Sequence, residues 1–400
     1  MIPRTKVSYR LADLLSAVLV EDRSERFRNA LRGELANLLG KPNILLSASG
    51  RGALYIVLKC LPQRRILIPA YTCKAVVEAA MLAGKDVVFG ELEPGGFNMS
   101  AYTVESMLNA DTILVATHQF GIPCEIKAMV GHAKKSGAFV LEDVAASLGT
   151  RVDGKLTGTF GDAAFFSFDS TKLVNAPLKG GALCVNDQAL FDRCEAFRKE
   201  NTFEMPLKRK VQYLLFGLAL LMLENPLLYR CFHNIKFRWR RRYTDDSADF
   251  MPRLSPFYLD QLSEWQAAIL LPQIRSLEQK IRIRQHIYSE YLKKLGKISS
   301  FALPPPDERR EWAPIRFPVR VVGDKLDFYR QAIKLGVDFA FSFTFIAAPK
   351  EYMLSHRLAA SILDLPFYER LAPSELEKVV AVMYELDDRM KESRSCACDK

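Results

Sequence analysis

Short apolar segments alternate with amphipathic ones between residues 43 and 190 of this 400-residue chain. Each apolar segment is four to six residues long and is followed by a turn, which is typical of a buried β-strand. These segments are residues 44–47, 66–69, 86–89, 112–116, 138–142, 163–168 and 182–185. The amphipathic stretches between them, such as 52–60, 73–83 and 126–136, have helical spacing. The alternation predicts an α/β domain with a largely parallel sheet that is covered on both faces.

A different pattern begins after residue 205. Residues 213–223 form an apolar run of eleven residues, and a basic stretch follows at 236–242. Eleven residues are too few to cross a bilayer, which takes about 20. The apolar run and its basic neighbour therefore have two interpretations. They form either a buried helix beside a solvated basic segment, or an interfacial element that contacts an anionic membrane through residues 208–242.

The rest of the chain repeats the α/β alternation on a smaller scale. A long helical pattern runs from about residue 255 to Leu295, followed by a strand at 315–321 and helices at 325–335 and about 374–391. Because 400 residues exceed what one hydrophobic core usually spans, we expect two domains. The first is a large domain over residues 1–250, which includes the insert at about 205–250. The second is a smaller C-terminal α/β domain over residues 251–400.

Composition and charge narrow the class of protein. An apolar fraction of 49% with 26% charged residues is typical of a globular protein and excludes a disordered or fibrous chain. Much of the net charge of +10 lies between residues 207 and 242, and because no nucleic-acid-binding motif accompanies it, we expect no nucleic-acid partner. The amino terminus lacks the apolar stretch of a secretory signal, and the eight cysteines lack zinc-site spacing. We therefore expect a cytoplasmic protein with reduced thiols and no metal, peripheral at the inner face of the membrane if the insert is interfacial.

Three segments carry reactive side chains at the ends of predicted strands. Asp143 follows one strand, Ser167 and Lys172 lie at and beyond the end of another, and the small residues at 47–52 open a helix. In parallel sheets, ligands bind beyond the carboxyl ends of the strands, and a glycine-containing helix start attracts phosphate. Each segment also has an ordinary structural interpretation, as a helix cap, a solvated edge residue or a common helix start. His118 is expected to be a hydrogen-bonded core residue rather than a catalytic one.

Taken together, these segments resemble the DegT/StrS-type sugar aminotransferases, which are fold-type I pyridoxal-phosphate enzymes. The resemblance covers most of the chain. It runs through SGRGAL, IPAYTCKAVVEAAMLAG, THQFGIP, EDVAASLG, GTFGDAAFFSFDSTK and LDLPFYERLAPSELEKVV. Asp143 and Lys172 are 29 positions apart, as the family pattern requires. The resemblance implies a large domain with a mostly parallel seven-stranded sheet and a smaller C-terminal α/β domain.

The resemblance also implies roles for individual residues. Lys172 is expected to bind pyridoxal 5'-phosphate covalently and to move a proton during amino transfer, with its pKa lowered by cationic neighbours. Asp143 is expected to pair with the pyridine nitrogen and keep it protonated. Ser167 and the backbone of Gly50 and Arg51 are expected to bind the phosphate, and the Arg51 guanidinium to add positive charge there. The family usually has threonine in place of this arginine.

Other positions depart from the family pattern and leave the substrate open. Ala146 stands where the family has a glutamine or histidine that contacts the cofactor's ring oxygen. Cys73 stands where an aromatic residue stacks on the ring, so Cys73 itself and Tyr71 are the two candidates for this contact. The loop after the lysine, LVNAPLKGG, is longer than in the family and contains Pro177 and Lys179. We find no convincing counterpart of the asparagine that reaches the phosphate from the partner subunit.

The sequence thus predicts a homodimeric aminotransferase that moves an amino group from an amino acid, glutamate as the leading candidate, to a nucleotide-linked keto-sugar for polysaccharide or glycan biosynthesis. Dimerisation is implied by the resemblance alone. Two alternatives stay open. One is another pyridoxal- or pyridoxamine-phosphate reaction on sugars, such as dehydration, against which Lys172 counts because the deoxygenating relatives carry histidine there. The other is a regulatory or binding protein that kept the fold without catalysis.

Overall fold

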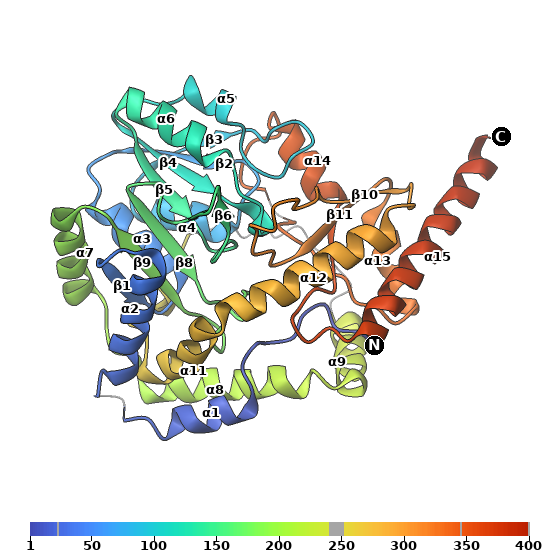
Figure 1. Cartoon of the computed structure of the whole chain (residues 1–400), viewed down its shortest axis with the longest axis horizontal. Coiled ribbons are helices and arrows are strands. Elements are labelled where there is room, and N and C mark those ends of the chain that lie inside the picture. The colour runs from blue at the N-terminus through green and yellow to red at the C-terminus, as the bar shows by residue number, and fades with distance from the viewer. Residues whose placement is uncertain (22–23, 240–251, 345, 399–400) are drawn as a thin grey trace.

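The computed structural model describes residues 1–21, 24–239, 252–344 and 346–398. Its largest element is a seven-stranded sheet with strand order β1-β9-β8-β5-β4-β2-β3. Figure 1 shows helices on both faces of this sheet, with the C-terminal elements to one side of it. The strands are β1 (Ile44–Ser47), β2 (Arg65–Pro69), β3 (Asp86–Gly90), β4 (Thr112–Thr117), β5 (Phe139–Asp143), β8 (Ala163–Ser167) and β9 (Gly181–Val185).

Strand direction places the carboxyl ends of six strands along one edge of this sheet. β9 is antiparallel to its neighbours β1 and β8, and the other adjacent pairs are parallel. All seven predicted strands belong to the sheet, so the predicted α/β class with a mostly parallel sheet is confirmed. Two short strands, β6 (Arg151–Val152) and β7 (Lys155–Leu156), pair separately.

Burial on both faces explains why the strands other than the edge strand β3 are almost continuously apolar. Successive side chains of a strand point to opposite faces. On β8, Phe165 packs with α3 (Gly50–Cys60), α4 (Lys74–Leu82) and α7 (Gln188–Asn201), whereas Phe166 packs with α2 (Arg26–Leu39) and α11 (Glu264–Arg275). Further along the sheet, α5 (Ala101–Glu105) and α6 (Ile126–Ser136) cover β4.

The C-terminal part builds a second, antiparallel sheet. Its three strands are β10 (Phe301–Ala302), β11 (Phe317–Val321) and β12 (Ile362–Leu365). One apolar cluster joins it to α12 (Leu277–Leu295), α13 (Lys325–Lys334) and α15 (Pro373–Cys398), while α14 (Met353–Ser361) precedes β12. The predicted strand at 315–321 and the two predicted helices after it correspond to β11, α13 and α15.

The single long helix expected from about residue 255 to Leu295 is wrong. The segment holds the short α10 (Pro256–Leu259), followed by α11 and α12, which are separated at Ser276 with φ −100° and ψ 12°. The Ser276 hydroxyl donates to the carbonyls of Pro272 at 2.9 Å and Gln273 at 3.3 Å. A proline in the last turn and a serine that bonds to the preceding carbonyls together end α11.

The insert forms two helices, α8 (Leu207–Met222) and α9 (Pro226–Trp239). α8 packs beside α1 (Leu11–Val18), and both run along the lower edge of the molecule in Figure 1. Six large apolar side chains of α8 are exposed to solvent, so the interpretation as a buried helix is wrong. Within the described residues, no single helix has both the length and the apolar composition to cross a membrane. Residues 240–242 of the basic stretch lie outside the described part.

Candidate active site

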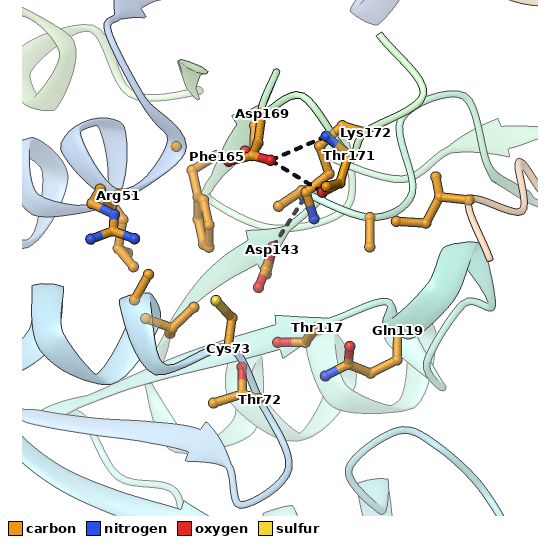
Figure 2. A pocket seen from close by; sticks show the side chains of 18 of the residues that line it. Arg51, Thr72, Cys73, Thr117, Gln119, Asp143, Phe165, Asp169, Thr171 and Lys172 are labelled. Atoms are coloured by element: carbon orange, nitrogen blue, oxygen red, sulfur yellow. Dashed lines mark hydrogen bonds between the residues drawn. The ribbon is translucent and has the colours of Figure 1, made fainter. Parts of the chain in front are cut away.

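A cavity of ≈ 200 Å³ opens at the carboxyl edge of the large sheet. Residues that end or follow β1, β2, β4, β5 and β8 line it, together with Ile315, Arg316 and Phe343 from the C-terminal part. Figure 2 shows Asp143 between Lys172 on one side and Cys73 on the other. Seven of the eight predicted site residues line this cavity, and these are Lys172, Asp143, Ser167, Gly50, Arg51, Cys73 and Ala146.

Two polar side chains form the floor of the cavity. Asp143 ends β5 and is buried, and its Oδ1 accepts the N–H of Ala145 at 3.0 Å. Burial raises the pKa of Asp143, although the Ala145 N–H and Lys172 oppose this shift. Thr117, the β4 residue paired with Asp143, has a buried hydroxyl without a hydrogen-bond partner among the described residues. A buried hydroxyl normally has a hydrogen-bond partner, and the Thr117 side chain belongs to a residue that lines the cavity.

The first turn of α3 forms one end of the cavity. Ser49 caps the helix by accepting the N–H of Gly52 at 3.0 Å. A Cβ on Gly50 would lie 2.8 Å from the Cβ of Ser167, and one on Gly181 would lie 2.3 Å from the backbone of Ser49. Glycine at both positions therefore lets the helix start approach the sheet edge closely. The N–H groups of a helix's first turn and a serine hydroxyl such as that of Ser167 are groups that can bind an anion.

Lys172 lies in the cavity wall on the loop between β8 and β9. The loop is fixed by Asn175, whose side-chain amide donates to the Lys172 carbonyl at 2.8 Å and whose backbone N–H donates to Gln273 Oε1 at 3.1 Å. Burial lowers the pKa of Lys172, and Arg316 lowers it further, against the opposing effect of Asp143. The amine therefore loses its proton more readily than that of an exposed lysine, as a nucleophile or base requires.

The unusual loop after Lys172 is closed by an ion pair between Asp169 and Lys179, both of which line the cavity. Asp169 Oδ1 also accepts the N–H of Thr171 at 3.1 Å (Figure 2). Burial alone would raise the pKa of Asp169, but Lys179 outweighs it and the pKa is lowered. Sequence reasoning noted Lys179 as a departure and did not find its partner, which lies ten positions away.

Arg316 brings a further cation to the cavity from the C-terminal part. Its Nη1 donates to Oδ2 of Asp364 at 2.6 Å, and Asp364 is buried in β12. The residue before it bonds to the turn that follows β4, since the Ile315 N–H donates to the Phe120 carbonyl at 3.0 Å. Arg316 was not predicted, because its only sequence signal was a position at the start of a strand.

The structure brings Cys73 to the cavity and leaves Tyr71 out of it. The Tyr71 side chain is fully buried, its hydroxyl donates to the Ser342 carbonyl at 3.1 Å, and its ring packs edge-on against Phe343 with centroids 5.3 Å apart. Of the two candidates for the ring contact, only Cys73 is in position. Ala146 lines the cavity but brings only a methyl group there.

Two other candidate residues have partners outside the anion site. The Arg51 guanidinium pairs with Glu78 at 3.3 Å, so its charge is partly neutralised. His118 is buried, as expected for a core residue, with Nε2 3.3 Å from Glu142 Oε2 and Nδ1 accepting the Cys124 N–H at 3.2 Å. Burial acts to lower the pKa of His118, whereas Cys124 and, after it, Glu142 act to raise it.

The cavity fits a ligand with a phosphate at one end and a protonatable ring nitrogen at the other. The helix start and Ser167 suit the phosphate, whereas Asp143 and the unsatisfied Thr117 hydroxyl suit a polar ring. A mostly parallel seven-stranded sheet with this site at its carboxyl edge is the architecture of the fold-type I pyridoxal-phosphate aminotransferases. The chain belongs to the DegT/DnrJ/EryC1/StrS aminotransferase family, which it matches over residues 18–224 and 230–384.

Individual relatives match part of the chain. The chain is 28% identical over 179 residues to a UDP-N-acetyl-3-dehydro-alpha-D-glucosamine 3-aminotransferase of Acidithiobacillus ferrooxidans, covering 44% of this chain and 48% of the relative. It is 32% identical over 155 residues to GDP-perosamine synthase of Escherichia coli O157:H7, covering 38% and 42% respectively. The matched regions thus span about half the length of these relatives or less. NtdA of Bacillus subtilis, solved with bound cofactor PMP, has a similar fold, with a TM-score of 0.73, 16% identity and coverage of 94% of this chain and 82% of that one.

Proposed function

We propose that this chain is a pyridoxal-phosphate-dependent aminotransferase that transfers an amino group from an amino acid to a nucleotide-linked keto-sugar. The observation that best supports this proposal is the position of Asp143 and Lys172 on one cavity that ends at the first turn of α3. Family membership supports the transaminase class, and the PMP bound by NtdA supports the cofactor. The proposal includes a homodimeric, cytoplasmic protein with the domain division expected from the sequence.

Each residue of the site has a definite task in this proposal. Bound pyridoxal phosphate supplies an electron-accepting ring that makes the Cα proton of the amino donor removable. With the cofactor bound, Lys172 Nζ would move this proton from Cα to the C4′ carbon of the cofactor, which its lowered pKa favours. In the second half of the reaction it would move a proton in the reverse direction, to the sugar carbon that receives the amino group. The Asp143 carboxylate holds a protonated ring nitrogen, while the Ser167 hydroxyl and the N–H groups of Gly50 and Arg51 hold the phosphate.

The charge of the cavity supports anionic substrates. The cavity lining contains four basic residues, Arg51, Lys172, Lys179 and Arg316, of which Arg51, Lys179 and Arg316 pair with Glu78, Asp169 and Asp364 respectively. Basic side chains at a partly closed site can bind the carboxylate of an amino donor and the diphosphate of a nucleotide sugar. The names of the two relatives, an aminotransferase for a UDP-linked sugar and GDP-perosamine synthase, support the same substrate class.

The test begins with the cofactor. Purified protein incubated with pyridoxal phosphate should gain a visible absorption band that borohydride fixes to the chain. Lys172→Ala should lose this covalent link and at least 10³-fold in turnover, about 4 kcal/mol of transition-state stabilisation. Lys59→Ala, an exposed lysine at the far end of α3, is the matched control and should behave as the unchanged protein.

Substrates are then tested as a panel of nucleotide keto-sugars with glutamate as donor, followed by detection of the amino sugar. A chain that takes up no cofactor would overturn the proposal as a whole. Full turnover in Lys172→Ala would overturn the assigned role of the lysine, and a chain that binds the cofactor but aminates none of the keto-sugars would overturn the substrate class.

A further inference from the structure

The outer side of α8 is apolar along its whole length. Five residues at helical spacing, exposed by 38 to 64%, form a stripe on its surface, and these are Leu207, Val211, Leu215, Leu218 and Met222. The inner side is buried through Tyr213 and Gly217, and a Cβ on Gly217 would lie 2.9 Å from Pro177. An ordinary surface helix buries its apolar stripe and exposes its polar side. α8 exposes an apolar stripe instead.

The neighbouring helices extend this surface. α1 packs on α8 through Leu14 and Ala17, and it exposes Leu11, Leu15 and Val18 at helical spacing, by 49 to 61%. α9 follows α8 after a bend of 111° and exposes Leu227, Leu228, Phe232 and Ile235. We call the exposed apolar side chains of α1, α8 and α9 the apolar face. Monomeric soluble proteins rarely expose contiguous apolar patches larger than a few hundred Å², and larger ones mark interaction sites.

The helices that carry the apolar face are firmly attached to the body of the protein. On α9, the Tyr229 hydroxyl donates to Asp338, and His233 Nε2 lies 3.1 Å from the Tyr329 hydroxyl. At the end of α8, Glu224 pairs with Arg370. Because polar contacts hold the inward sides of these helices, their apolar stripes cannot turn into the core without breaking those contacts.

The charges around the apolar face indicate what covers it. Of the basic residues of α8, Lys208 is exposed, Arg209 pairs with Asp260 and Lys210 is buried. The acidic residue of α1, Asp13, accepts the backbone N–H of Arg10 at 2.6 Å. Lys208 and Arg230 are exposed at the start of α8 and on α9, and no charged residue occurs from 211 to 223. An apolar helical face bordered by cations matches the headgroup layer of an anionic bilayer. A second copy of the chain would instead bring the same positive charges together.

We propose that the apolar face binds the surface of an anionic phospholipid bilayer, with α1 and α8 lying in the headgroup region. α8 and α9 meet the criteria for a membrane span by length and composition only when taken together across their 111° bend. Contact in the plane of the interface is therefore favoured over a span. The inference does not depend on the proposed enzymatic function.

The test is co-sedimentation of the full chain with vesicles of phosphatidylcholine, with and without phosphatidylglycerol. Binding should require the anionic lipid and weaken at high salt. Leu215→Glu combined with Leu218→Glu should reduce the partition coefficient at least tenfold. The matched control is Val322→Glu combined with Met353→Glu, which adds the same charge at residues that are 53% and 59% exposed elsewhere, and it should bind within twofold of the unchanged chain.

Circular dichroism verifies that each variant folds, and if the glutamate pair does not fold, Leu215→Gln with Leu218→Gln takes its place. Failure of the unchanged chain to sediment with anionic vesicles would overturn the inference. Equal binding by the Leu215/Leu218 pair and its control would overturn it too. A third outcome is that the unchanged chain is a dimer with negligible vesicle binding and that the Leu215/Leu218 double variant is a monomer by ultracentrifugation. The apolar face would then be a contact between copies, which also overturns the bilayer assignment.

Discussion

Gly50→Ala tests whether the anion site depends on the close approach of α3 to β8. The new Cβ would lie 2.8 Å from the Ser167 Cβ and 3.1 Å from the Phe166 carbonyl oxygen, and both residues are fixed in the middle of the sheet. Overpacking of this kind costs about 1–3 kcal/mol. The better helix propensity of alanine offsets up to about 1 kcal/mol. With the full offset, the net expectation is a destabilisation of about 0–2 kcal/mol and an outward shift of the first turn of α3.

The shift should weaken pyridoxal-phosphate binding by up to about tenfold, because 1.4 kcal/mol corresponds to a factor of ten. Gly33→Ala in α2 is the control. No atom lies within 4 Å of its new Cβ, so it should stabilise the protein by about 0.5–1 kcal/mol and leave cofactor binding unchanged. Urea unfolding followed by circular dichroism measures stability, and cofactor titration followed by absorbance measures binding. If Gly50→Ala matches Gly33→Ala in both measurements, the packing argument is refuted.

Three further changes test other parts of the structure. Arg316→Gln removes a positive charge that lowers the pKa of Lys172, so this pKa should rise. The pH profile of cofactor absorbance should therefore move to higher pH. An unchanged profile would show that burial alone lowers the pKa of Lys172. Thr117→Val should stabilise the cofactor-free protein by about 1 kcal/mol, because it removes a buried unsatisfied hydroxyl, yet weaken cofactor binding; a loss of stability in urea would contradict this. Asp338→Asn removes the negative charge that pairs with Arg4 at 3.0 Å and weakens the hydrogen bonds that Asp338 accepts from two tyrosine hydroxyls. It should lower the free energy of unfolding by about 2 kcal/mol. A change of less than about 0.5 kcal/mol would show that these bonds contribute little to stability.

The sequence predicted those parts of the fold that depend on local pattern. Six of the seven strands of the large sheet were found because burial on both faces makes them almost continuously apolar, while the half-exposed edge strand β3 was found from its three apolar residues at 87–89. Asp143, Ser167 and Lys172 were found because they follow such strands, and the carboxyl ends of parallel strands meet at one edge. The helix break at Ser276 was missed because apolar periodicity continues through it, while the hydroxyl that ends α11 gives only a weak local signal.

The positions of Lys179 and Arg316 in the site depend on contacts between segments that are distant in the sequence. The contact made by Lys179 also explains the longer loop after Lys172, which departs from the family pattern. Lys179 in the longer loop was an unexplained cation from the sequence alone, yet it pairs with Asp169 and closes that loop beside Lys172. Arg316 comes from the C-terminal part and is held by Asp364, so its charge lowers the pKa of the lysine from a fixed position. The altered loop therefore leaves Lys172, with its lowered pKa, on the same cavity as the buried Asp143, and this supports the proposed aminotransferase over a regulatory protein without catalysis.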